Sequence, residues 1–180
     1  MTKYNNLKQT EEKTAAVVTA KDVVKESLRE VRELSKSLNT DVINNKGFQE
    51  SIQNEIDRLN RLEIFNANLS IKGDKELIQN QKDSIIIFRI FQEFLSNTIK
   101  YAEANNFQVN IHYLDDKLIM TAIDDGKGFD QNKVEKGAGL INMESRAKLI
   151  KASYKLESAL NQGTTLEVVY PYRNTQSIKL

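Results

Sequence analysis

Four polar side chains that could act on a phosphate recur at short spacing between positions 93 and 101: Glu93, Asn97, Lys100 and Tyr101. Residues three and four apart lie on one side of an α-helix, so a helical segment would align these side chains in one stripe. An amide oxygen can bind Mg²⁺, a lysine can offset phosphate charge, and a glutamate can accept a proton from an attacking group. Such stripes are also common on solvated helix faces, so the stripe alone leaves both interpretations open.

A second polar cluster follows the apolar run in LIMTAIDDGKGFDQ, at 118–131. Asp124 and Asp125 end the run, and Gly126 and Gly128 follow. A calcium-binding EF-hand loop is excluded, because neither alignment of its invariant glycine completes the pattern of oxygen ligands. The segment also lacks the Gly-Lys-Ser/Thr of a P-loop and the full dinucleotide fingerprint. A nucleotide would therefore have to bind here in another geometry.

A third candidate is the sequence Gly137, Ala138, Gly139, which directly precedes a predicted helix. Backbone N–H groups at a helix N-terminus bind anions, and glycines allow a ligand to approach closely. Glycine turns commonly precede helices, so this pattern by itself is weak support for a phosphate site.

Hydrophobic periodicity predicts the elements that position these residues. We expect helices over 14–39, 48–62, 85–104 and 139–152, and strands over 64–71, 107–114, 117–124, 154–160 and 164–172. Asp83 or Ser84 is expected to cap the third helix. Strands that alternate with long helices predict an α+β fold, a two-layer α/β sandwich in which one mixed sheet carries helices on one face.

The N-terminal segment is expected to stand outside this sandwich as a long helix. Its apolar residues recur every seven positions at Val17, Val24, Val31 and Leu38. The stripe fits either an amphipathic helix on a globular core or a partner helix in a bundle or dimer, and its length favours the dimer. We expect three parts: residues 1–41 as an incomplete dimerisation region, 42–173 as the main domain, and 174–180 as a tail.

The overall composition excludes several classes of function. The 26 basic and 25 acidic residues balance, so no global field attracts nucleic acid or an anionic membrane. Cysteine is absent, which excludes thiolate metal sites and thiol nucleophiles. No apolar run reaches the length of a membrane span, and the first residues have no signal-peptide character. We expect a cytoplasmic chain without membrane contact of its own, while a membrane-anchored parent protein stays open.

Four motifs taken in order are more specific than any one of them: QEFLSNTIKY, DDGKGFD, GAGLINMESRA and QGTTLEVVYP. Together they resemble the ATP-binding domain of the sensor histidine kinases of two-component systems, which belong to the GHKL ATPases with gyrase B and MutL. The resemblance covers residues 48–172. Within it, RIFQEFLSNTIKYA (89–102) is similar to the asparagine motif of the subfamily with a short ATP lid, RIxQExLxNxxKHA. It implies a Bergerat-type fold that binds ATP and Mg²⁺.

The resemblance implies roles for the residues of the predicted stripe. Glu93 is the general base or activator, Asn97 is the Mg²⁺ ligand and Lys100 faces the phosphates. Tyr101 stands where the subfamily usually has histidine. A phenol can bond a phosphate but carries no positive charge, so this departure bears on Mg-ATP affinity and turnover.

The resemblance also implies how the base is bound. Asp124 accepts a hydrogen bond from the adenine amino group, Gly126 and Gly128 shape the pocket floor, and Thr164 bonds the water or ring nitrogen beside Asp124. The lid and helix start near the phosphates comprise Gly137, Gly139 and Leu140.

Such kinases phosphorylate a histidine on the first of two dimerisation helices, but His112 is the one histidine here and falls on a predicted strand. The segment 14–39 resembles the second dimerisation helix. We therefore expect a fragment of a longer, homodimeric kinase that binds nucleotide without phosphorylating itself. A natural truncated partner kinase is the alternative. A response regulator is the implied protein partner.

Two other functions fit the same resemblance. A serine kinase of the anti-sigma-factor type shares the fold, although it would not need the heptad helix. A catalytically weak GHKL domain that acts as a dimeric interaction module would be consistent with Tyr101. Mg²⁺-dependent ATP binding distinguishes the kinase from the interaction module.

Overall fold

The computed structural model of the protein describes residues 47–73, 80–131, 133 and 137–171. The expected helix over 14–39, the boundary near residue 41 and the tail lie outside the described residues. The helices are α3 (Phe48–Arg61), α4 (Gln81–Asn97) and α5 (Ala138–Leu149), and the π-helical turn η2 (Thr98–Ala102) continues α4. The strands are β1 (Asn66–Lys72), β2 (Asn106–Tyr113), β3 (Lys117–Asp124), β4 (Ser153–Ser158) and β5 (Thr164–Pro171).

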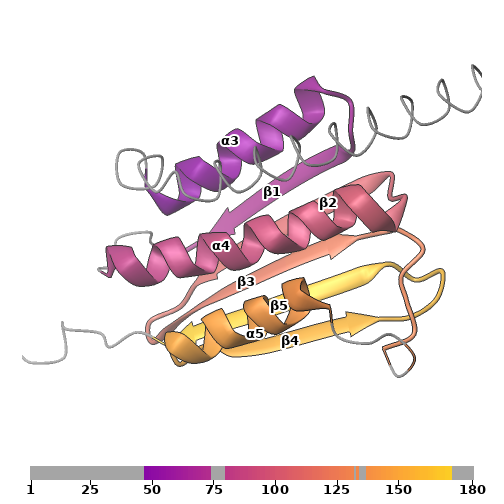
Figure 1. Cartoon of the computed structure of the whole chain (residues 1–180). Helices are drawn as coiled ribbons and strands as arrows, with labels where there is room; N and C mark the ends of the chain where they lie inside the picture. The colour runs from indigo at the N-terminus through magenta and orange to yellow at the C-terminus, as the bar shows by residue number, and fades with distance from the viewer. Residues whose placement is uncertain (1–46, 74–79, 132, 134–136, 172–180) are drawn as a thin grey trace, which may run out of the picture. The chain divides into compact units, whose positions relative to one another are not determined.

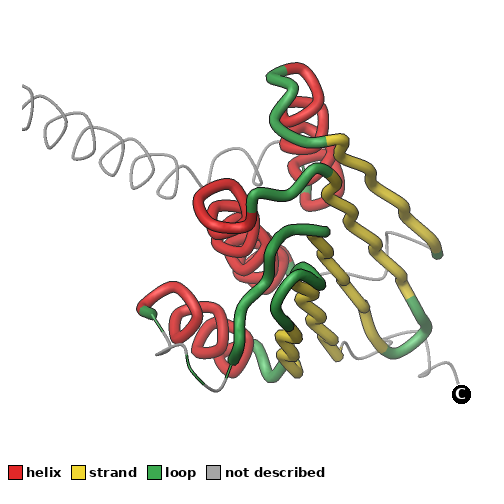
Figure 2. The backbone as a smooth tube through the Cα atoms, turned by 90° about the vertical axis from the view of Figure 1, so that its right-hand side faces the viewer, coloured by secondary structure: helices red, strands yellow, loops and turns green. Residues whose placement is uncertain are grey.

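The five strands form one mixed sheet in the order β1-β2-β3-β5-β4. Strand β1 pairs with β2 in parallel, whereas the β2–β3, β3–β5 and β5–β4 pairs are antiparallel. Figure 1 shows α3, α4 and α5 lying across this sheet, and Figure 2 shows the same helices together on one side of the strands. The predicted α+β two-layer architecture is confirmed.

The alternation of side chains along the strands explains why the helices cover one face. Strand β3 alternates strictly between buried and half-buried positions, with Leu118, Met120, Ala122 and Asp124 buried. Because successive side chains of a strand point to opposite faces, these four share the face that packs on the helices. The last of them is a carboxylate, so the apolar row ends in a charged group beneath the helices.

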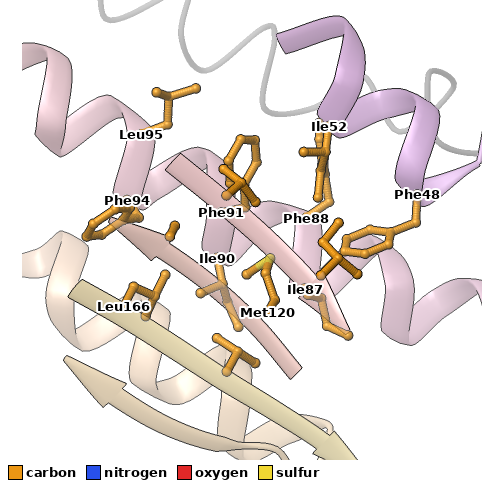
Figure 3. Close-up of a cluster of buried hydrophobic side chains, with 14 of the residues drawn as sticks. Phe48, Ile52, Ile87, Phe88, Ile90, Phe91, Phe94, Leu95, Met120 and Leu166 are labelled. Carbon is orange, nitrogen blue, oxygen red and sulfur yellow. The ribbon is translucent and has the colours of Figure 1, made fainter. Parts of the chain in front are cut away.

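The core fills the space between the two layers. Figure 3 shows Ile87, Ile90, Phe91 and Phe94 of α4 directed toward Met120 of β3 and Leu166 of β5, with α3 residues at one side. The ring of Phe107, at the start of β2, is fully buried and lies 5.9–6.3 Å, centroid to centroid, from the rings of three other phenylalanines. Those rings are Phe65, Phe91 and Phe94.

Helix α4 begins earlier than predicted. Its N-cap is Asn80, whose side-chain oxygen accepts hydrogen bonds from the backbone N–H groups of Lys82, at 3.1 Å, and Asp83, at 3.4 Å. The expectation that Asp83 or Ser84 caps the helix is therefore wrong. Asparagine is a strong N-cap, and here it satisfies N–H groups that have no partner within the helix.

Helix α4 also does not continue as a regular α-helix to residue 104, as predicted. It ends at Asn97, and the wider π-helical turn Thr98–Ala102 follows. Glu103 then closes the turn in the left-handed region, with φ 53°. A π-turn contains one residue more than an α-turn, so the spacing that would align Asn97 with Lys100 and Tyr101 no longer holds. Among the described residues, no helix is long and apolar enough to cross a membrane.

Replacing Phe107 with alanine is expected to destabilise the domain by about 3–5 kcal/mol, because it removes a fully buried ring that three aromatic neighbours enclose. Chemical denaturation followed by circular dichroism measures the free energy of unfolding. Leu149→Ala is the control, since Leu149 is 73% exposed and its loss should change stability by less than about 0.5 kcal/mol. Equal effects of the two substitutions would contradict the proposed core.

Candidate functional site

Asp124 lies at one end of the sandwich, where β3 stops. Its direct cross-strand neighbours are Phe107 on β2 and Thr164 on β5. Directly paired residues place their side chains on the same face of a sheet, so the Asp124 carboxylate lies between an aromatic ring and a hydroxyl, under the helices. Only 3% of Asp124 is exposed. The structure therefore places this acid in a largely desolvated position.

Three groups of the chain donate hydrogen bonds to this carboxylate. The backbone N–H of Gly126 donates to Oδ1 at 3.0 Å, the Thr98 hydroxyl lies 3.1 Å from Oδ2, and the backbone N–H of Thr164 also contributes. Burial raises the pKa of Asp124 above its ordinary value, and the nearby charge of Asp125 acts in the same direction. The three donors oppose this rise but do not cancel it.

Thr98 is a site residue that the sequence did not reveal. It is 3% exposed, and its hydroxyl lies near two acceptors, Oδ2 of Asp124 and the backbone carbonyl of Phe94 at 3.2 Å. A hydroxyl has one hydrogen, so it can donate to only one of them at a time. If Asp124 is protonated on Oδ2, the acid can donate to Thr98 while Thr98 donates to Phe94. The arrangement therefore accommodates both protonation states.

Asp125 has a different environment from its neighbour. Its Oδ1 accepts the backbone N–H groups of Asn105 and Asn106 at 2.8 Å, and its Oδ2 accepts the Asn106 side-chain amide at 2.6 Å. The backbone and side-chain hydrogen bonds from Asn106 lower the pKa of Asp125. Asp125 thus ties the end of β3 to the chain that enters β2. The adjacent Lys127 pairs with Glu103 at 2.7 Å.

The glycines of the DDGKGFD segment are required by close backbone packing. A β-carbon on Gly126 would lie 2.3 Å from the carbonyl oxygen of Ala102, at the end of η2. Gly128 has a φ of 54°, and a β-carbon there would lie 2.1 Å from the carbonyl oxygen of Ala159. Both contacts are with backbone atoms, which cannot move aside easily. These glycines therefore hold the segment against η2 on one side and the β4–β5 turn on the other.

The other candidate residues meet where α4 and α5 approach each other. A β-carbon built on Gly139, in the first turn of α5, would lie 2.4 Å from Oε1 of Glu93 and 3.5 Å from Nδ2 of Asn97. The start of α5 thus touches both polar side chains of α4, and its positive helix end faces a carboxylate. Around Gly137 there is open space, and Leu140 is half-buried against the core.

Lys100 and Tyr101 are not part of a continuous stripe with Glu93 and Asn97. Both lie on η2 and are exposed, Tyr101 to 64%. The predicted stripe is therefore confirmed for the first two residues, which meet at Gly139, and wrong in its helical geometry for the last two. The roles that the resemblance implies for all four stay predictions.

Glu93 and Asn97 bring a carboxylate and an amide group to the same place beside Gly139, where the amide nitrogen Nδ2 is the Asn97 atom near the glycine. Carboxylate and amide oxygens are ligand types suited to Mg²⁺. Within the part of the chain that the structure describes, no group of three or more acidic, histidine or cysteine side chains could hold a metal by itself. Mg²⁺ is usually bound by one or two protein oxygens together with water and substrate phosphates. The residues present fit that form of metal site.

Asp124→Asn and Asp125→Asn are expected to change stability with opposite pH dependence. The folded pKa of Asp124 is raised, so its contribution to stability is present below the unfolded pKa of about 3.9 and is lost as pH rises through the folded value. Asp124→Asn should therefore gain stability relative to wild type as pH rises above 4. The folded pKa of Asp125 is lowered, so its contribution is lost as pH falls through the folded value.

Denaturation midpoints between pH 3 and pH 7 test this pair of substitutions. Asp125→Asn should be most destabilising near neutral pH and approach wild type in acid. Parallel pH profiles for the two variants would refute the different environments of the two carboxylates.

Comparison with known proteins identifies the family. Residues 82–174 match the histidine kinase-, DNA gyrase B- and HSP90-like ATPases. An uncharacterized sensor-like histidine kinase of Chloroflexus aurantiacus is 28% identical over 159 residues, covering 83% of the chain and 26% of the relative. The signal transduction histidine-protein kinase/phosphatase DegS of Brevibacillus brevis is 29% identical over 150 residues, covering 83% of the chain and 39% of the relative. The chain thus spans well under half the length of these relatives.

Solved structures share the fold. Histidine kinase AdeS of Acinetobacter baumannii superposes with a TM-score of 0.59 at 16% identity, covering 84% of each chain. The histidine kinase domain of the blue-light-activated kinase from Erythrobacter litoralis EL346 gives a TM-score of 0.55 at 15% identity, covering 69% of this chain and 64% of that one. The family match extends over more than half of the 180 residues. The chain therefore belongs to the histidine kinase-, DNA gyrase B- and HSP90-like ATPases and carries the ATPase domain of a sensor histidine kinase.

Proposed function

We propose that the domain binds Mg-ATP and supplies the γ-phosphoryl group to a histidine in the phosphotransfer reaction of a two-component sensor kinase. The observation that carries this proposal is the buried carboxylate of Asp124 at the same end of the sandwich as the contact between Glu93, Asn97 and the start of α5. In this proposal Asp124 binds the adenine base, and Glu93, Asn97 and the start of α5 bind the phosphates and the metal. In this proposal the full kinase is homodimeric and passes the phosphoryl group to a response regulator.

Asp124 reads the adenine. Its Oδ2 keeps a lone pair for the exocyclic amino group, because one hydrogen bond from Thr98 does not use all of its acceptor capacity. A base that places an acceptor against the buried carboxylate leaves this group without a hydrogen-bond donor, which costs free energy. Asp124 therefore discriminates against such bases. Gly126 and Gly128 fix the backbone that carries this carboxylate, and Thr164 lies directly across the strand pair.

The phosphates extend toward the start of α5. At the start of α5, the N–H groups of Leu140 and Ile141 donate to the carbonyl of Gly137, so the N–H groups of Ala138 and Gly139 are the ones that bind phosphate oxygens. Gly137 and Gly139 offer no side chain to block them, and Leu140 anchors the turn on the core. Asn97 holds Mg²⁺, which neutralises charge on the phosphates. Glu93 accepts the proton of the attacking group. Lys100 and Tyr101 face the phosphates from η2, where both are accessible.

His112 is not the phosphoryl acceptor in this proposal. The buried residues of β2 alternate at Phe107, Val109, Ile111 and Tyr113, so the exposed His112 points to the face of the sheet opposite Asp124. It is also five residues along the strand from Phe107, the neighbour of Asp124, which corresponds to about 17 Å. The acceptor is a histidine elsewhere in the kinase.

Asp124→Asn is expected to abolish measurable ATP binding without unfolding the domain. The amide can donate to Thr98, which then donates to Phe94, so the substitution keeps the internal hydrogen bonds that a protonated acid would make. The side-chain amide of the variant presents a donor where the adenine amino group needs an acceptor. We therefore expect the affinity for Mg-ATP to fall by at least about 100-fold. Isothermal titration calorimetry with Mg-ATP measures this loss.

Asp116→Asn is the matched control, because it makes the same change of charge in the exposed β2–β3 turn. If Asp124→Asn bound Mg-ATP with unchanged affinity, the assignment of Asp124 to the adenine base would be refuted. A wild-type protein that folds but does not bind Mg-ATP would refute the proposed function and favour an interaction module.

Gly139→Ala is expected to weaken the binding of Mg-ATP about tenfold while leaving the binding of adenosine unchanged. The added carbon displaces the Glu93 side chain by steric contact and so disturbs the part of the site where the phosphates bind. The expected loss in binding free energy is about that of one charge-assisted hydrogen bond. Titration with both ligands separates the two ends of the site.

Ser145→Ala on the exposed side of α5 is the control for the gain in helix propensity that alanine brings. An equal loss of adenosine and Mg-ATP binding in Gly139→Ala would contradict the placement of the phosphates at α5.

A further inference from the structure

A hollow lies over β1, β2 and β3 on the face of the sheet opposite to α3, α4 and α5. Six side chains of this face line it in two rows of direct cross-strand neighbours: Lys72, His112 and Ile119 in one row, and Ser70, Asn110 and Thr121 in the other. Neighbouring strands lie about 4.7–4.9 Å apart, so the polar groups of both rows can reach one small ligand.

The first row supplies positive charge. Lys72 carries an ammonium with three N–H donors, and the ring of His112 presents at least one N–H in either protonation state. Both side chains are exposed, and within the described ranges no hydrogen bond or ion pair of the chain uses either of them. Their donors are therefore available to a ligand.

The second row supplies neutral donors. The Asn110 Oδ1 accepts a hydrogen bond from the Gln108 side-chain amide at 3.1 Å, which leaves the two N–H groups of Asn110 available. The hydroxyls of Ser70 and Thr121 take part in no hydrogen bond with other described residues. Donors thus come from three strands and surround the hollow.

The acidic residues of the neighbouring segments do not line the hollow. Glu167 is the neighbour of Thr121 on β5, and its neighbour on the other side is Lys155 of β4. Asp115 and Asp116 lie in the exposed turn between β2 and β3. A hollow with a cation, several donors and no carboxylate attracts an anion and repels a metal ion.

We propose that this hollow binds a phosphate group. A phosphate group presents three acceptor oxygens in different directions, which matches donors from three strands better than the two coplanar oxygens of a carboxylate. The volume of the hollow is about 240 Å³, below the range of about 300–1,000 Å³ for pockets that hold drug-sized ligands. The ligand is therefore a small phosphate compound or the free ion, and a nucleotide is too large.

The only histidine of the chain, His112, supplies the test, because its ring signals in proton NMR report on this hollow alone. Titration of the full chain with inorganic phosphate, at fixed pH and ionic strength, should shift these signals to a plateau, and sodium chloride should not. Phosphate that binds at the start of α5 instead would leave the ring signals unchanged. An unchanged or unsaturable shift, or an equal shift with chloride, would overturn the inference.

Two further ligands identify the chemical class. Methyl phosphate tests whether the group is bound as a monoester: a similar Kd assigns a small phosphorylated compound, and binding of inorganic phosphate alone assigns the free ion. Either result supports a phosphate site. Acetate that binds as tightly as both phosphates would overturn the choice of a phosphate group. Because the hollow lies on the face opposite to Asp124, none of these results bears on the proposed function.

Lys72→Ala should weaken phosphate binding by about tenfold or more, the effect of one charge-assisted hydrogen bond, and Lys72→Arg should restore most of it. Lys155→Ala is the matched control, because it removes the same charge from an exposed position at the other edge of the sheet. Equal weakening by Lys72→Ala and Lys155→Ala would show that phosphate responds only to net charge and would overturn the inference.

Thr121→Val tests the neutral donors, because valine keeps the shape of the side chain without the hydroxyl. We expect the Kd for phosphate to rise by about threefold to tenfold, the effect of one neutral hydrogen bond. His112 is retained in every variant, so the same NMR signals measure each Kd. A folded Thr121→Val protein with unchanged Kd would contradict the inferred ring of donors.

Discussion

The site depends on one unfavourable placement, a carboxylate at the end of a buried strand. Asp124 continues the apolar row of β3 onto the helix-covered face, beside the ring of Phe107, and a charged group there must be surrounded by donors. Thr98, Gly126 and Thr164 supply them. Each donor comes from a different segment, so the need to satisfy one acid brings together the start of η2, the loop after β3 and the start of β5.

Two adjacent aspartates divide into two roles because a strand alternates its side chains. Asp124 faces the helices and is desolvated, whereas Asp125 turns outward and accepts three hydrogen bonds from Asn105 and Asn106. Their pKa values move in opposite directions for the same reason. The pair shows how one residue can be available for a ligand while its neighbour is fully used in holding the chain.

The sequence predicted the architecture, since it depends on patterns local to a segment, whereas the roles of the site residues stay predictions. Strand alternation marked β2, β3 and β5, and the glycines beside Asp124 marked a close backbone approach. The π-turn after Asn97 was not predictable, because one extra residue per turn leaves no periodic signal over five residues. Thr98 was also missed. Its hydroxyl acts on Asp124, which is 26 positions away in sequence, and nothing in the local pattern distinguishes Thr98 from other polar side chains.

The described segments around Asp124 are held together by hydrogen bonds within the chain. Asp124, Asp125 and Ser158 each hold backbone N–H groups of neighbouring segments, and Gly126 and Gly128 are packed against backbone carbonyls. The conformational entropy of this end is therefore lost when the domain folds, before any ligand arrives. In the proposed function, a rigid purine ring binds to an end of the domain that is already ordered, so little conformational entropy is lost there on binding.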